Sequence, residues 1–163
     1  MAAERQAVSV PSVPIFGDPK WIMGGADQRS DDSGHVAHSK PVKIVVVDDE
    51  PVIAETVVEI LKEEGFQAVS VSNGNAAVEL AKTLRPDIIL SDVIMPGLNG
   101  IETAIRIREI VPACKVILFS GQAATVDLLE NARRQGHRFE VLAKPVSPER
   151  LISVVRATSG RHS

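Results

Sequence analysis

The 163-residue sequence has little of several features that define common protein classes. It contains one cysteine, Cys114, which excludes an intramolecular disulfide framework and a zinc site built from cysteines. No apolar run approaches the roughly 18 residues that a transmembrane helix needs, so no membrane association is expected. The N-terminal segment has no continuous hydrophobic stretch of the kind found in a signal peptide, because prolines and glycines interrupt it. These absences predict a soluble, cytoplasmic protein.

The charge balance and the placement of glycines disfavour two further kinds of partner. The chain has 18 Lys and Arg against 21 Asp and Glu, and the resulting net charge of −3 argues against nucleic acid as a sequence-independent partner. A phosphate-binding glycine loop of the Gly-x-Gly-x-x-Gly type is missing, which disfavours a nucleotide site. No nucleic-acid partner is therefore expected.

The composition changes near residue 41. Residues 1–41 contain scattered prolines, glycines and polar residues with no sustained hydrophobic period, and they are predicted to form a flexible arm. Regular hydrophobic patterning then covers residues 42–158, which we predict to be the folded domain. Residues 159–163 are expected to be a short C-terminal tail.

Short β-branched runs alternate with amphipathic segments throughout this domain. The runs predict strands at 43–47, 68–72, 87–91, 115–119 and 140–143, and the segments predict helices at 52–64, 76–84, 100–110, 124–135 and 148–157. In the first helix, Ile53, Val57, Ile60 and Leu61 are expected to form the inner face. Strands that alternate with helices pair in parallel, so the fold class is α/β: a doubly wound five-stranded parallel sheet with helices on both faces, as in flavodoxin-like folds.

Chemically active side chains follow four of the five strands. Asp48 and Asp49 come after the first strand, Asp92 after the third, Ser120 after the fourth and Lys144 after the fifth. Because the functional crevice of such a sheet lies beyond the carboxyl ends of its strands, we expect these groups to meet there. Each residue alone has an ordinary interpretation, such as a turn cap or a surface charge, but their joint placement favours a functional site.

The acids and the lysine in this set predict a specific chemistry. Converging carboxylates repel one another, and Mg²⁺ is the hard, oxygen-preferring cation that relieves this repulsion. A lysine ammonium across the crevice attracts a phosphoryl group, and a serine hydroxyl can donate a hydrogen bond to it. The set therefore predicts a carboxylate that accepts phosphate with the help of a metal.

These residues resemble the receiver domain of bacterial two-component response regulators. The resemblance extends over residues 42–157 and includes Asp48-Asp49-Glu50, the Asp92–Gly100 segment with its Met-Pro pair, and Lys144-Pro145. It implies that Asp92 is the phosphoacceptor and that a histidine kinase or a histidine phosphotransfer protein is the donor. It further implies that Ser120 moves to the phosphoryl group and shifts the face formed by the fourth helix, the fifth strand and the fifth helix.

The resemblance also implies a ligand set for Mg²⁺. Asp49 and Asp92 would bind the ion directly, together with the backbone carbonyl of Ile94, while Asp48 would act through water. Lys144 would pair with Asp92 or with its phosphate.

The sequence departs from the receiver pattern at one position. Receivers usually carry Tyr or Phe three residues before the lysine, as a ring that turns inward on activation, and this chain has Val141 there. Phe139 lies two residues earlier, on the same side of the strand. Either Phe139 replaces the ring from a shifted position, or Ser120 and the loop after it act alone.

The function predicted from the sequence is a phosphorylation-dependent signalling switch in a stand-alone receiver. Enzymatic activity is not expected beyond self-catalysed phosphotransfer and autodephosphorylation. One alternative is a receiver-like protein-binding module that works without phosphorylation. Another is a Mg²⁺-dependent phosphatase with an aspartyl nucleophile, which ranks last because Ile94 cannot serve as the general acid. The kinase and the downstream protein partner cannot be named from the sequence.

Overall fold

The structure is a computed structural model in which residues 40–121 and 123–160 are described. Residues 1–39 lie outside this part, so the flexible arm predicted for residues 1–41 stays a prediction. The predicted tail, residues 159–163, is described up to Gly160.

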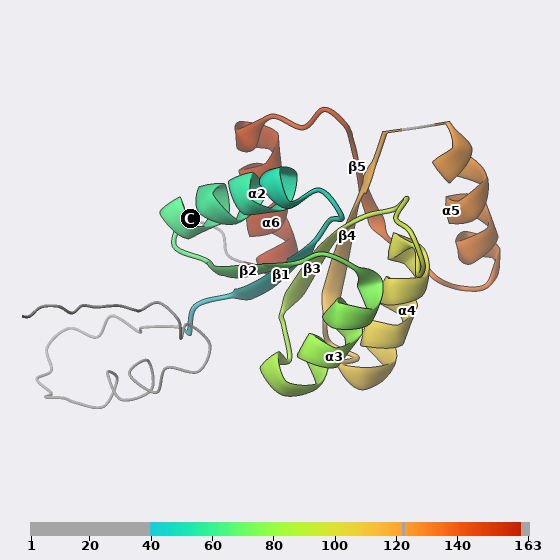
Figure 1. The fold of residues 1–163 in the computed structure, drawn as a ribbon, viewed down its shortest axis with the longest axis horizontal. Coiled ribbons are helices and arrows are strands. Elements are labelled where there is room, and N and C mark those ends of the chain that lie inside the picture. The colour runs from blue at the N-terminus through green and yellow to red at the C-terminus, as the bar shows by residue number, and fades with distance from the viewer. Residues whose placement is uncertain (1–39, 122, 161–163) are drawn as a thin grey trace, which may run out of the picture. The chain divides into compact units, whose positions relative to one another are not determined.

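Strands and helices alternate along the described residues, as Figure 1 shows. The strands are β1 (Lys43–Val47), β2 (Gln67–Val71), β3 (Ile88–Asp92), β4 (Lys115–Ser120) and β5 (Glu140–Ala143). The helices are α2 (Pro51–Glu63), α3 (Gly74–Leu84), α4 (Gly100–Ile110), α5 (Ala124–Arg134) and α6 (Pro148–Ser159). Every predicted element is present, with its ends at most two residues from the predicted ones.

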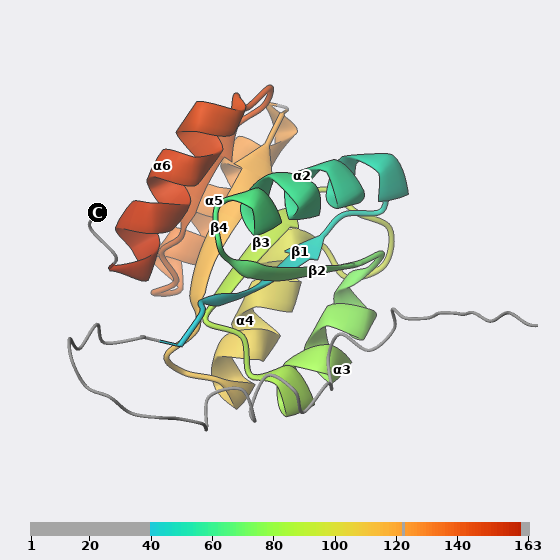
Figure 2. The same ribbon diagram turned by 90° about the vertical axis from the view of Figure 1, so that its left-hand side faces the viewer.

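The five strands form one parallel sheet in the order β2-β1-β3-β4-β5. Helices α2 and α6 cover one face, and α3, α4 and α5 cover the other, as the two views together show (Figures 1 and 2). The predicted fold class, a doubly wound parallel sheet of the flavodoxin-like type, is confirmed. The strand order reverses between β1 and β3, and the crevice of such a sheet opens at this reversal, beyond the carboxyl ends of the strands.

The apolar runs of the strands supply both halves of the core. In β1, Ile44 and Val46 pack in the cluster beneath α2 and α6, whereas Val45 and Val47 pack in the cluster beneath α3, α4 and α5. Successive side chains of a strand point to opposite faces, so a strand covered on both sides must be apolar at every position. This requirement explains why β1 reads as an unbroken β-branched run.

The inner face of α2 differs from the predicted one. Ala54, Val58 and Leu61 are buried against the sheet, whereas Ile53 is 43% exposed. Residues 53, 57 and 60 have the same i, i+4, i+7 spacing as residues 54, 58 and 61, so the period alone does not separate the two stripes. The prediction was therefore wrong for Ile53, whereas Val57 and Ile60 pack against the core while partly buried, and Leu61 is fully buried as predicted.

Side-chain caps fix the starts of three helices. Asn73 accepts a hydrogen bond from the backbone of Ala76 at the start of α3, and Ser147 accepts one from Arg150 at the start of α6. Asn99 and Glu102 form a reciprocal capping box at the start of α4, which satisfies two backbone donors at once. The loops that end in these caps all lie at the edge of the sheet where the site residues gather.

None of the helices within residues 40–121 and 123–160 combines the length and the apolar character that a membrane crossing requires.

Candidate functional site

Three carboxylates meet at the carboxyl edge of the sheet. Asp48 and Asp49 follow β1 directly, and Asp92 is the last residue of the neighbouring strand β3. One oxygen from each of the three lies within 4.8 Å of the other two. The structure thus brings together the three acids that the sequence predicted to converge, at a spacing that one small cation could bridge.

Asp48 is the most deeply placed of these acids, with 3% of its surface exposed. Burial raises the pKa of the Asp48 carboxyl, and repulsion by Asp92 and Asp49 raises it further. The backbone N–H of Glu50, which donates to Asp48 Oδ1 over 2.9 Å, and the Lys144 ammonium lower it. The pKa of Asp48 lies above its ordinary value, chiefly because burial disfavours the charged carboxylate.

Lys144 supplies the positive charge nearest to the acceptor. Its Nζ donates a hydrogen bond to Asp92 Oδ2 over 2.9 Å, and both side chains are partly shielded from water. The lysine follows β5 and reaches past β4 to the end of β3, while its backbone N–H donates to the carbonyl of Ser120. The predicted pairing of Lys144 with Asp92 is present in the structure.

The loop after Asp92 is folded tightly against the acceptor strand. A Cβ placed on Gly100 would lie 2.1 Å from the carbonyl oxygen of Asp92, so any larger residue would force the backbone apart. The Gly100 N–H donates to the carbonyl of Val93 over 2.8 Å, and Met95 is buried. The start of α4 therefore fixes the backbone that carries the acceptor.

Ser120 ends β4, and its hydroxyl points to α5. Its Oγ forms a hydrogen bond with Oγ1 of Thr125, a buried residue in the first turn of that helix. Among the described residues, the wall of the adjoining cavity includes Gly121 but not Ser120. Thr125 was missed by the sequence analysis, because a threonine in the first turn of a helix is ordinary and carries no signal of its own.

A cavity of about 880 Å³ opens from the carboxylates into the space between α2 and α6. Asp49, Asp92 and Lys144 line one end, and apolar residues of both helices line the rest. At its rim Val52 and Ile94 are 76% and 41% exposed. Large exposed apolar side chains beside a polar site are typical of an interaction surface. This groove was not predicted from the sequence, because Ile53, which is exposed at the cavity, was expected to be buried.

Val141 and Phe139 lie on the same side of the sheet but in different surroundings. Val141 pairs with Leu118 in the β4–β5 register and is 37% exposed. Phe139 precedes β5, packs at the edge of the core beneath α4, and its ring centroid lies 4.6 Å from the guanidinium carbon of Arg108. The ring of His137 stacks on it at 6.4 Å. Phe139 is thus held at the opposite end of the sheet from Ser120.

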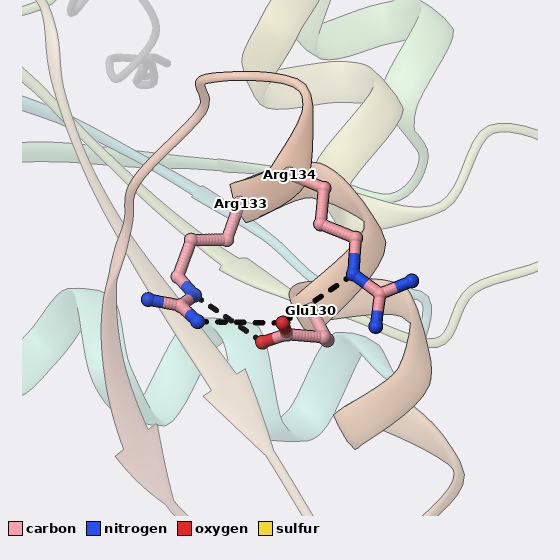
Figure 3. A network of polar contacts seen from close by, with 3 residues as sticks. All are labelled: Glu130, Arg133 and Arg134. Atoms are coloured by element: carbon pink, nitrogen blue, oxygen red, sulfur yellow. Dashed lines mark hydrogen bonds and ion pairs between the residues drawn. The ribbon is translucent and has the colours of Figure 1, made fainter.

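The C-terminal half of α5 carries a small ion-pair network. Arg133 and Arg134 both reach Glu130 of the same helix, as Figure 3 shows. The paired Arg133 lowers the pKa of the Glu130 carboxyl, and Glu130 in turn raises the pKa of the Arg133 guanidinium. All three side chains face water, where such pairs contribute little to stability. The carboxylate of Glu130 therefore partly balances the positive charge of the two arginines, which do not form an isolated basic patch.

The profile of the response regulator receiver domain matches residues 44–156. The chain belongs to this family, which carries the receiver function of two-component systems.

Individual relatives agree with this assignment. The chain is 32% identical over 121 residues to the probable transcriptional regulatory protein TcrX of Mycobacterium tuberculosis, covering 74% of this chain and 51% of TcrX. It is 32% identical over 117 residues to Protein PilH of Pseudomonas aeruginosa, covering 71% of this chain and 95% of PilH. A receiver domain protein from Clostridium thermocellum has the same fold, with a TM-score of 0.67, 27% identity and coverage of 74% of this chain and 95% of that one. The chain thus spans about half the length of TcrX and most of PilH.

Proposed function

We propose that this chain is a phosphorylation-dependent signalling switch in which Asp92 accepts a phosphoryl group. The observation that carries the proposal is the grouping around one carboxylate. Oxygens of Asp48, Asp49 and Asp92 lie within 4.8 Å of one another, and the Lys144 ammonium is 2.9 Å from Asp92 Oδ2. This arrangement offers a nucleophilic oxygen, a place for a cation and a fixed positive charge at one point.

The donor in this proposal is a histidine kinase or a histidine phosphotransfer protein. An oxygen of Asp92 forms the new bond to phosphorus, the bond from phosphorus to the donor's imidazole nitrogen breaks, and that nitrogen takes up a proton. Lys144 stays beside the Asp92 carboxyl and holds an oxygen of the transferred group. Ser120 turns its hydroxyl toward another of these oxygens. Apart from this self-catalysed transfer and the later hydrolysis, no enzymatic activity is proposed.

The acidic cluster fits a Mg²⁺ ion. The donor set is made of hard oxygens that lie within 4.8 Å of one another, so a bound cation would relieve the repulsion among the three carboxylates. In the proposed site Asp49, Asp92 and the backbone carbonyl of Ile94 hold the ion directly, and Asp48 holds it through water. Mg²⁺ in this position supplies positive charge to the phosphoryl oxygens during transfer.

Two surfaces have separate roles in the proposal. The exposed apolar residues Val52 and Ile53 of α2, together with Ile94, border the acidic site, and we assign the donor's contact to them. The signal leaves through the face formed by α5, β5 and α6, where Ser120 touches Thr125 and where Val126 is exposed. The downstream protein is unidentified, and the cytoplasmic location expected from the sequence is part of the same proposal.

Intact-mass measurement tests the central step. After incubation with Mg²⁺ and acetyl phosphate, the wild-type chain should gain the mass of one phosphoryl group. Asp92→Asn should gain none while keeping its circular dichroism spectrum, and Asp49→Ala should also gain none, with little rescue by excess metal. Asp127→Asn, which changes an exposed acid of α5, is the matched control and should label normally. Labelling of Asp92→Asn at the wild-type level would refute the acceptor, and a wild-type chain without labelling would favour the phosphorylation-independent binding module.

A further inference from the structure

Ser120 and Thr125 join the sheet to α5 through their hydroxyl groups. Ser120 ends β4, at the edge where Asp92 and Lys144 lie, and its Oγ hydrogen-bonds to Oγ1 of Thr125. The Thr125 side chain is 1% exposed, so this hydroxyl is shielded from water. A buried hydroxyl needs a partner inside the protein, and the bond to Ser120 therefore ties the first turn of α5 to the strand.

The rest of α5 is attached less firmly than its neighbours. The helix begins after Ala123, whose methyl group cannot cap the backbone, whereas Asn99 and Ser147 cap α4 and α6. Among the α5 residues whose side chains the structure describes, Thr125 and Ala132 are buried. Leu128 and Leu129 pack against the core while partly buried, and the hydroxyl pair adds a contact at the start of the helix.

The chemistry of a hydroxyl makes this pair sensitive to a phosphoryl group. The Ser120 side chain has one hydroxyl, which can point toward Thr125 or toward a phosphoryl oxygen on Asp92, but not toward both at once. A hydrogen bond to a charged oxygen is stronger than one between two neutral hydroxyls. Phosphorylation of Asp92 therefore competes with Thr125 for the hydroxyl of Ser120.

We propose that Thr125 is a positioning residue that holds the Ser120 hydroxyl toward α5 until Asp92 is phosphorylated. The inference rests on the proposed function and deepens it. When Ser120 turns away, the hydrogen bond that joins the end of β4 to the first turn of α5 is lost, and the start of α5 shifts relative to the strand. Thr125 sets how readily Ser120 is captured and passes the change to α5. In this chain the hydroxyl pair carries the signal that Val141, which has no ring, cannot carry.

Titration of the full chain with a phosphoryl mimic tests this role. Beryllium fluoride is added in the presence of Mg²⁺, and amide resonances of α5 report the response. Thr125→Val keeps the branched shape but removes the hydroxyl, so Ser120 is no longer held back. The midpoint of its titration should fall about fivefold, the equivalent of one neutral hydrogen bond. Without the mimic, its β4 and α5 resonances should already lie displaced toward their positions in the bound wild type. Thr125→Ser should behave as the wild type.

Thr103→Val is the matched control. Thr103 is also a buried threonine near a helix start, but its Oγ1 donates to the carbonyl of Asn99 over 2.8 Å and it belongs to α4. Its substitution should lower the melting temperature and leave the midpoint unchanged. Should Thr125→Val prove unfolded, Thr125→Ala removes the same hydroxyl and should lower the midpoint in the same way.

Three results would overturn the inference. These are a Thr125→Val midpoint equal to that of the wild type, the same midpoint shift in Thr103→Val, or a Thr125→Ser protein that behaves as Thr125→Val. Intact mass separates these failures from a failure of the proposed function. If wild-type protein gains the phosphoryl mass and Thr125→Val responds as the wild type does, the positioning role alone is wrong. If the wild type gains no mass, both proposals are wrong.

Discussion

Lys144 and Asp92 are 52 positions apart in the sequence, yet Nζ of the lysine lies 2.9 Å from Oδ2 of the aspartate. The contact spans β4, which separates β3 from β5 in the sheet. It places one positive charge against a cluster of three acids, and this charge competes with a bound cation for the same carboxylate.

Lys144→Met should therefore separate metal binding from phosphoryl uptake. Removing the ammonium leaves the carboxylates with more net negative charge, so Mg²⁺ affinity measured by calorimetry should rise by roughly a factor of ten. Phosphoryl uptake from acetyl phosphate, followed by intact mass, should slow by at least a similar factor because the incoming group loses a positive partner. Lys62→Met, at an exposed ion pair on α2, is the control and should change neither quantity. Weaker Mg²⁺ binding in Lys144→Met would contradict the competition.

Gly100→Ala should damage both stability and the site. The new Cβ would lie 2.1 Å from the Asp92 carbonyl oxygen, so the acceptor strand and α4 must separate, at a cost of about 1–3 kcal/mol. Urea unfolding should show this loss, and phosphoryl uptake should fall with it. Gly65→Ala has a positive φ of 93° but open space around the new Cβ, so it should cost about 1 kcal/mol and leave uptake unchanged. Full stability and full uptake in Gly100→Ala would show that the loop adapts without moving Asp92.

Cys114 should be unreactive in the folded protein. Its side chain is 3% exposed, and burial raises the pKa of the thiol from its ordinary value to about 12. Because the thiolate is the reactive form, iodoacetamide at pH 8 should modify the unfolded chain far faster than the folded one. The raised pKa also means that this group's contribution to stability is lost as the pH rises from about 9 toward 12. Equal alkylation rates with and without denaturant would place the thiol at the surface.

Phe139→Leu should change the stability of the domain, whereas Ser120→Ala should change its response to phosphorylation. Phe139 contacts Arg108 and His137 far from Ser120, so its replacement should reduce the free energy of unfolding by about 1 kcal/mol and leave the α5 response intact. Ser120→Ala should keep phosphorylation at Asp92 but blunt the response of α5 and α6. Amide shifts with and without beryllium fluoride, compared across the three proteins, measure both effects. If Phe139→Leu erased the response and Ser120→Ala did not, the ring would be the switch.

The sequence was sufficient to predict the sheet and the charged part of the site. Strands buried on both faces must be apolar at every position, so runs such as Lys43–Val47 and Lys115–Ser120 stand out. In a parallel sheet the residues after the strands meet at one edge, so Asp48, Asp92 and Lys144 could be grouped without coordinates.

Two features could not be predicted for physical reasons. On α2, the residues that face the sheet and those that face the cavity have the same spacing, so the hydrophobic period does not separate them. Ile53 was predicted to be buried because its side chain is large and apolar, but the small side chain of Ala54 is the buried one. The pairing of Ser120 with Thr125 depends on how the loop between them turns, and a neutral hydroxyl pair leaves no charge or period in the sequence.

The strand order also determines when the site becomes complete as the chain is made. The carboxylates lie on β1 and β3, neighbours that a nascent chain can pair before its second half has left the ribosome. Lys144 arrives with β5, the last strand, and its ammonium is then added to acids that have already been brought together. A truncated product that stops before β5 would hold the acids without their lysine. Charge balance at Asp92 therefore depends on the domain having been synthesised as far as its final strand.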